Sequence, residues 1–174
     1  MSEEPQRLVL DVWPDAADPE AGRWLAALDR VRRGTNELLD EIEPGAIDAD
    51  PGDGGDSLGT VIYHLALVEV DWVYSDILDR ESDISREMFP HDDRESDGRL
   101  TPVTGESMAE QRARLDRARS MIIEVIAGLS SEEFLRVRPR SWGEASAAWI
   151  VFHLIDHEVE HRVRIARIRD AFRR

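Results

Sequence analysis

The sequence predicts an all-α protein built as a four-helix bundle. Four stretches of roughly 20 residues carry apolar side chains at helical spacing. No segment shows the sustained alternation and the β-branched enrichment that mark a strand. The 174 residues are enough for one domain with a substantial core. We therefore expect an extended lead-in over residues 1–18 and a single bundle domain over residues 19–174.

The first helix is predicted to begin after Asp18, which suits the N-cap, with Pro19 in the first turn. Its apolar side chains recur at helical spacing until Pro44: Trp24, Leu25, Leu28, Val31, Leu38, Leu39 and Ile42. The stretch 45–56 is rich in Gly and Asp and is therefore predicted to be a loop.

The second helix is predicted to begin after Ser57 as its cap. One continuous apolar stripe follows, formed by Val61, His64, Leu65, Val68 and Trp72. Residues 80–106 are polar and contain two prolines and two glycines, which predicts a long connection with a helical turn near residues 85–89. This connection is long enough to cross over the bundle and to allow parallel pairing of helices.

The third helix is predicted to open with a capping box formed by Ser107 and Glu110. A brief helical start is expected at residues 130–133, and a loop at residues 139–144. The fourth helix is expected to run from about Ser146 to Arg169. Its predicted inward stripe contains Trp149, Ile150, His153, Leu154, His157, His161, Arg164, Ile165 and Ile168. Trp24, Trp72 and Trp149 are expected to anchor the core.

The composition excludes several kinds of chemistry. The chain has no cysteine, so it cannot use disulfides, thiolate metal ligands or cysteine nucleophiles. It also has no lysine, which excludes Schiff-base chemistry and the P-loop lysine. The formal net charge of −15 argues against a nucleic-acid partner, because such binding depends on clustered basic side chains. Any nucleophile must therefore come from water or from a cosubstrate.

The expected location is the cytoplasm. No apolar run approaches the roughly 20 residues that span a bilayer. The first five residues are mostly acidic or polar and do not resemble the start of a signal peptide. We expect no membrane partner.

Histidines are the most informative residues of this chain. His153, His157 and His161 follow one another at intervals of four residues in the fourth predicted helix, and His64 lies in the stripe of the second. An interval of four residues turns about 40° and rises about 6 Å, so two imidazoles can reach one ion. An interval of eight doubles both values and strains a shared site. We expect two of the three to bind a metal directly, with His64 as the third ligand.

Two other metal sites can be read from the same residues. The segment from His157 to His161 matches H-E-x-x-H, the helix motif of metalloproteases, with Glu158 as general base. No strand that would align a peptide is evident, and Glu158 could instead point outward and pair with Arg162. A di-iron carboxylate site would need a second Glu-x-x-His and two further inward glutamates, which the sequence does not offer. Both alternatives are weaker than the three-histidine site.

The order of the motifs resembles the DinB-like superfamily over nearly the whole chain. The resemblance rests on Ser57-Leu-Gly-Thr-Val-Ile-Tyr-His64-Leu and on Trp149, His153-Leu-Ile-Asp-His157-Glu-Val-Glu-His161-Arg. That superfamily includes mycothiol-dependent maleylpyruvate isomerase and bacillithiol S-transferases. The resemblance implies a four-helix bundle with an unusual helix order. It also implies a metal held by His64, His157 and His161, with His153 one turn away as a pocket residue.

The sequence departs from the resemblance just after the last histidine. Many members continue as His-Arg-Gly-Gln-Ile, whereas this chain has Val163 and Arg164 in place of the glycine and the glutamine. The expected ligands are unchanged, but the pocket wall beside them differs. The substrate therefore cannot be carried over from the resemblance.

The expected function is that of a metal-dependent enzyme acting on a small molecule. Three imidazoles leave a coordination position open, which is the pattern of a catalytic site. The reaction would be hydrolysis or transfer of a low-molecular-weight thiol such as mycothiol, with Glu69, Asp71 or Glu158 as proton acceptor. The metal could be Zn, Ni, Mn or Fe, all of which accept three nitrogens. The alternative is a non-catalytic metal-binding stress or interaction protein.

Homodimerisation through an outer helical face is common for bundles, but the sequence does not identify the face.

Overall fold

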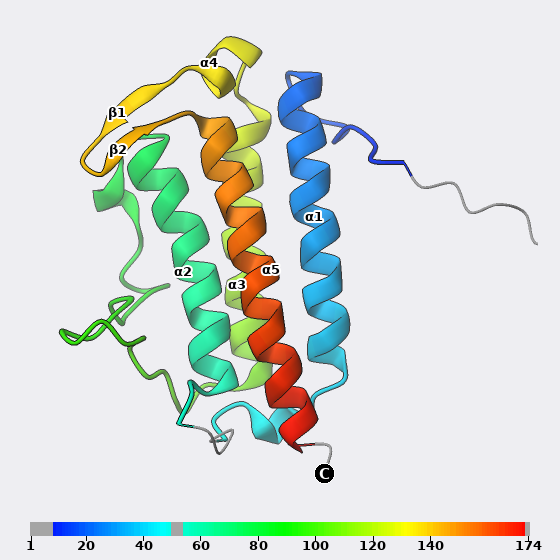
Figure 1. Cartoon of the computed structure of the whole chain (residues 1–174), viewed down its shortest axis with the longest axis vertical. Coiled ribbons are helices and arrows are strands. Elements are labelled where there is room, and N and C mark those ends of the chain that lie inside the picture. Colours follow the sequence, from blue (N-terminus) through cyan, green and yellow to red (C-terminus); the bar gives the residue numbers. More distant parts are fainter. Residues whose placement is uncertain (1–8, 50–53, 173–174) are drawn as a thin grey trace, which may run out of the picture.

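The fold is a bundle of four long helices capped at one end by a short helix and a hairpin (Figure 1). The computed structural model describes residues 9–49 and 54–172. The long helices are α1 (Pro19–Asp40), α2 (Leu58–Asp76), α3 (Met108–Ala127) and α5 (Ala147–Phe172). The short elements are α4 (Ser131–Leu135), β1 (Arg138–Arg140) and β2 (Gly143–Ala145). The predicted all-α four-helix bundle is confirmed.

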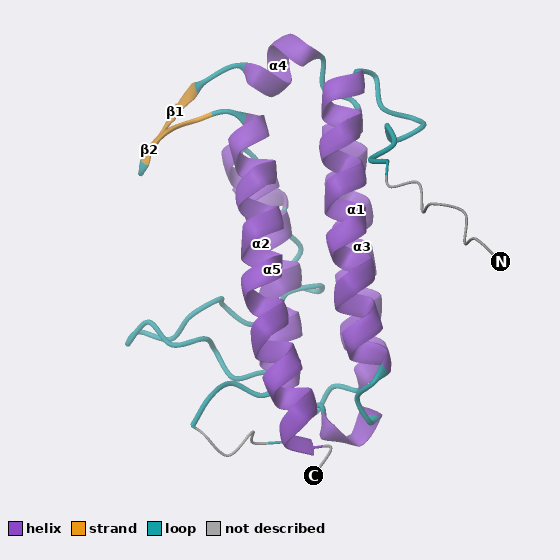
Figure 2. Cartoon of the chain, turned by 45° about the vertical axis from the view of Figure 1, so that its right-hand side comes forward, coloured by secondary structure: helices purple, strands orange, loops and turns teal. Residues whose placement is uncertain are grey.

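The long connection between α2 and α3 allows these two helices to run in the same direction (Figures 1 and 2). Gly59 donates its N–H to the carbonyl of Ile47 over 2.8 Å, so α2 starts near the end of α1. Ala17 donates to the carbonyl of Ala127 over 2.8 Å, so α3 ends near the start of α1. Because α2 packs against both α3 and α5, its residues face a helix on either side.

The helices begin at the residues whose side chains can bind the free N–H groups of a first turn. Asp18 accepts from the N–H of Glu20 over 2.8 Å, and Pro19 opens α1. Ser107 and Glu110 form the predicted capping box at the start of α3. At the starts of α2 and α4, the side chains of Ser57 and Ser130 accept from the N–H groups of Thr60 and Glu133. The sequence signals for the helix starts are therefore confirmed.

The centre of the bundle contains charged residues as well as apolar ones. Each long helix contributes one: Arg32 from α1, Glu69 from α2, Arg119 from α3 and Glu158 from α5, which we call the buried ion-pair cluster. All four are at most 6% exposed. The Arg32 guanidinium lies 2.8 Å from Glu69 and 2.9 Å from Glu158. Arg119 binds the same two carboxylates, so the two positive charges of the cluster balance its two negative charges.

One detail of the predicted fold is wrong. Residues 138–145 form an antiparallel hairpin in which Arg140 pairs with Gly143, where we expected only a loop. Its strands have three residues each, too short for alternation to be visible in the sequence. The predicted helical turn at residues 85–89 is confirmed, because the Phe89 N–H donates to the Ser85 carbonyl four residues earlier.

The predicted inward stripe of the last helix is correct only in part. Ile150, Leu154, His161, Ile165 and Ile168 are buried as expected. Trp149 is 44% exposed and Arg164 is also exposed, so neither anchors the core. Glu158 occupies an inward position instead. The stripe is therefore rotated away from the tryptophan and toward the buried ion-pair cluster.

The predicted boundary between lead-in and domain stays a prediction. Residues 1–8 of the lead-in lie outside the described residues, as do residues 50–53 of the predicted loop and residues 173–174 of the predicted domain. Residues 9–18 form no helix or strand. None of the helices in the described part of the chain is long and apolar enough to cross a membrane.

Candidate metal centre

Three histidines from two helices meet at one point beside a cavity. His64 comes from α2, and His157 and His161 come from successive turns of α5. Each offers one ring nitrogen, and these three nitrogens lie within 4.8 Å of one another. The Nε2 atoms of His64 and His157 are 3.0 Å apart. This cluster could hold a metal ion.

The helices explain why these rings converge. The interval of four residues between His157 and His161 places their ring centroids 4.4 Å apart on one side of α5. Because α2 packs against that side, the ring of His64 lies 5.0 Å from the ring of His157 and 4.8 Å from that of His161. Residues 93 positions apart in the chain thus face a common centre.

The donor set fits a transition metal. Burial, together with the neighbouring imidazoles, lowers the pKa of His157 to about 4 and that of His161 to about 3. Both rings are therefore neutral near pH 7 and keep a lone pair for a metal. The Nδ1 atom of His161 is buried and has no hydrogen-bond partner among the described residues. Two nitrogens on one tetrahedral zinc ion are about 3.3 Å apart, close to the spacing of His64 and His157.

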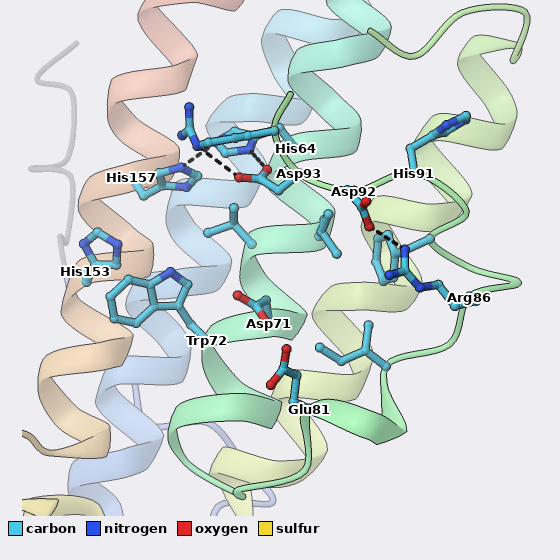
Figure 3. Close-up of a pocket in the computed structure, with 15 residues that line it drawn as sticks. His64, Asp71, Trp72, Glu81, Arg86, His91, Asp92, Asp93, His153 and His157 are labelled. Atoms are coloured by element: carbon cyan, nitrogen blue, oxygen red, sulfur yellow. Dashed lines mark hydrogen bonds and ion pairs between the residues drawn. The ribbon is translucent and has the colours of Figure 1, made fainter. Parts of the chain in front are cut away.

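Asp93 fixes the orientation of His64 from the long connection between α2 and α3 (Figure 3). Its Oδ1 atom lies 2.5 Å from Nδ1 of His64. An ionised carboxylate can only accept, so Nδ1 donates and the lone pair of His64 is left on Nε2. Although burial alone would raise it, the hydrogen bond with His64 lowers the pKa of Asp93 below its ordinary value. No spacing or motif in the sequence marks Asp93 as a partner of His64.

His153 does not join the three converging rings. Its ring is 6.0 Å from that of His157 and lies parallel to the ring of Trp149 at a tilt of 2°. The ring of His153 is also 4.3 Å from the ring of Trp72 (Figure 3), and Trp72 and Trp149 are themselves 5.9 Å apart. His153 is therefore a wall residue of the cavity, as the resemblance implied. His91 lies on the surface of the long connection, where its backbone binds the hydroxyl of Tyr63.

Glu158 cannot act as a general base, because Thr35 and two arginines already bind its carboxylate oxygens. Its Oε1 atom accepts from Thr35 over 2.6 Å, and its Oε2 atom lies 2.7 Å from Arg119. Although burial alone would raise it, Arg32 and Arg119 lower the pKa of Glu158. The proposed outward pairing with Arg162 is wrong, because the Arg162 guanidinium lies against Gly34 of α1. The H-E-x-x-H match thus lacks the free glutamate that a peptidase needs.

A cavity of about 540 Å³ opens beside the histidines, within the usual size range of small-molecule sites. His64 and His157 form part of one wall, and Trp72 and His153 form another. Asp71 and Asp93 add carboxylates, while Leu67, Val68, Ile84 and Phe89 add apolar surface. A small molecule in this cavity would lie next to the rings of His64 and His157.

Comparisons with known proteins agree with this fold. The family model described as the DinB superfamily matches residues 27–164. A crystal structure of a conserved protein from Enterococcus faecalis is similar, with a TM-score of 0.66 and 18% sequence identity. The match covers 85% of this chain and 94% of the Enterococcus chain. No curated protein matches. Since the family model covers most of the chain, this protein belongs to the DinB superfamily.

Proposed function

We propose that the protein is a metal-dependent enzyme that binds a divalent transition metal at His64, His157 and His161. The observation that carries the proposal is the convergence of three ring nitrogens within 4.8 Å, two of which belong to the cavity-lining residues His64 and His157. A dication held by three imidazoles keeps an open position, where it would lower the pKa of a bound water or thiol. The reaction is hydrolysis of a small molecule or transfer to it of a low-molecular-weight thiol such as mycothiol.

Asp71 is the candidate proton acceptor. In either reaction the nucleophile loses a proton as its oxygen or sulfur bonds to the electrophilic atom, and the leaving group departs with its electron pair. Glu69 and Glu158 are held by arginines, whereas Asp71 lines the cavity. Burial raises the pKa of Asp71, and Glu81 and Asp76 add repulsion, so its carboxylate is a stronger base than a free aspartate.

The cavity favours catalysis over the alternative of a non-catalytic metal-binding protein. A purely structural site would be closed, with four protein ligands around the ion. Here the histidines border a cavity large enough for a substrate. The absence of cysteine and lysine requires the nucleophile to enter through that cavity as water or as a thiol.

Turnover by metal-loaded protein tests the proposal. The protein is loaded in turn with Zn, Ni, Mn or Fe and mixed with an ester, or with a chloroaromatic electrophile plus a low-molecular-weight thiol. We expect product in excess of enzyme, loss of turnover in His157→Ala, and at least about tenfold slower turnover in Asp71→Asn. Asp116→Asn, on the exposed side of α3, is the control and keeps the parent rate. Metal binding without turnover of either substrate class would favour the non-catalytic alternative.

A further inference from the structure

The outward surface of α5 differs from that of every other long helix. Large apolar residues that are strongly exposed include Trp149 at 44%, Phe152 at 49%, Val159 at 42% and Val163 at 52%. In the described part of the chain, α1, α2 and α3 have no large apolar residue in this exposed class. We call the surface formed by these four residues the α5 outer face. Helix α5 itself passes in front of α3 in the view of Figure 1.

These side chains form one strip along the helix. At 100° per residue, the four lie within about 80° of the helix circumference. Ala148, Ile155 and Ala166 are partly buried and extend the strip along one edge. Phe152, Ile155, Val159, Val163 and Ala166 then follow one another at intervals of three or four residues. This spacing is that of a helix which packs against another helix.

Charges within and beside the strip are separated along its length. At 100° per residue, Asp156 lies inside the strip, about 20° from Val163, and Glu160 lies just beyond its edge on the side that faces α2. Arg164 and Arg167 follow toward that side one and two turns after Glu160. All four are exposed. A parallel copy of α5 would bring acid against acid and base against base. An antiparallel copy brings the acids of each helix opposite the arginines of the other.

We propose that a second copy of this chain binds the α5 outer face, with the two α5 helices antiparallel. The two-fold axis lies between Val159 and Val163, which form the centre of the contact. Asp156 and Glu160 of each copy face Arg167 and Arg164 of the other. Such an interface is self-complementary, as a two-fold dimer requires. The inference is independent of the metal and of any catalytic activity.

The same charges argue against a membrane or a nucleic acid as the occupant. Asp156 lies within the strip and Glu160 at its edge, and the chain carries a net charge of −15. Anionic lipid headgroups and phosphates would therefore be repelled rather than attracted. A second copy carries the matching pattern of both signs, which favours it over these partners.

The mass of the full-length protein in solution tests the proposal. Sedimentation equilibrium between about 1 and 100 µM should give twice the 19.8 kDa of one chain. The double variant Val159→Glu, Val163→Glu should weaken the dimer at least about 100-fold, because four carboxylates would meet at the axis. Ala113→Glu places the same charge on the exposed side of α3 and should leave the dimer intact. A monomeric parent, or a dimer that survives the double variant, would overturn the proposal.

Charge reversal tests the direction of the helices and keeps the apolar strip intact. Glu160→Arg alone should weaken the dimer about tenfold, since it faces Arg164 of the second copy. Adding Arg164→Glu should restore the parent affinity, although Arg164 also lies 3.2 Å from Asp56 of its own chain. Circular dichroism confirms that each variant is folded. Failure of the second reversal to restore affinity would rule out the antiparallel arrangement.

Discussion

At the scale of single residues, the contact between Asp93 and His64 fixes the orientation of the His64 ring toward His157 and His161. Asp93 is 33% exposed and reaches His64, which is 3% exposed, from a loop. A carboxylate that holds a ligand histidine commonly contributes 10- to 100-fold to metal affinity. No periodicity or spacing in the sequence connects residue 93 with residue 64, because their contact depends on how the long connection folds back.

Replacement of Asp93 should therefore weaken metal binding without unfolding the bundle. We expect Asp93→Ala to lower zinc affinity about 10- to 100-fold, as measured by competition with a coloured chelator. Asp93→Asn keeps an acceptor oxygen and should recover part of the loss. Asp92→Ala is the control, because Asp92 is exposed and binds Arg86 instead. Equal affinity in Asp93→Ala and the parent would show that Asp93 does not position His64.

The low pKa values of His157 and His161 predict how the metal-free protein responds to acid. Both rings stay neutral in the fold down to about pH 4 and about pH 3, whereas in the unfolded chain they take up protons near pH 6.5. The unfolded state thus binds more protons in this window, so the free energy of unfolding should fall as pH drops from about 6.5 to about 4.

Urea unfolding of the metal-free protein at a series of pH values measures this effect. The double variant His157→Gln, His161→Gln should show a flatter pH dependence between about pH 6.5 and pH 4. His91→Gln changes an exposed loop histidine and should keep the dependence of the parent. Identical slopes in the parent and the double variant would mean that these rings do not resist protonation in the fold.

At the scale of the helices, the buried ion-pair cluster ties all four long elements together. The positions of two of its members in the sequence already indicate that they are buried. Arg32 follows Leu28 by four residues, and Glu158 follows Leu154 by four, so both stand at core-facing positions. Charged residues at such positions can be paired with one another inside a bundle. The partner of each one could not be predicted, because it depends on which helices are neighbours.

Removing one member of the cluster should be costly. We expect Glu158→Ala to lower the free energy of unfolding by about 3–5 kcal/mol, since Arg32 and Arg119 would be left buried with one carboxylate between them. Denaturant unfolding of the metal-free protein gives this value. Glu124→Ala on the exposed side of α3 is the matched control and should change it by less than about 0.5 kcal/mol. A loss below about 1 kcal/mol for Glu158→Ala would contradict this view of the cluster.

At the scale of the whole molecule, the sequence predicted the bundle because long amphipathic helices and their caps leave local signals. The starts after Asp18, Ser57 and Ser107 depend on side chains within three residues of the helix end. The hairpin at residues 138–145 was missed because it is held mainly by tertiary packing. Trp142 at its turn lies 5.2 Å from the ring of Trp72 and 5.5 Å from that of Trp149. Three residues per strand cannot reveal such contacts in advance.

For the candidate site, the sequence predicted the two helices and their histidines but not the full arrangement of the rings. The interval of four residues between His157 and His161 and the apolar stripe around His64 indicated two helices that meet at a metal. Geometry alone left open which two of the three α5 histidines would converge with His64. In the structure, packing of α2 against α5 brings His157 and His161 to His64, and the stack with Trp72 and Trp149 holds His153 away.

Metal content of the purified protein tests the central claim most directly. Elemental analysis of the parent, His64→Ala and His157→Ala should give about one transition-metal ion per chain in the parent and much less in both variants. His91→Ala, which changes a histidine outside the cluster, should retain the metal of the parent. Equal metal content in all four samples, or none in the parent after loading with Zn, Ni, Mn and Fe, would contradict the account.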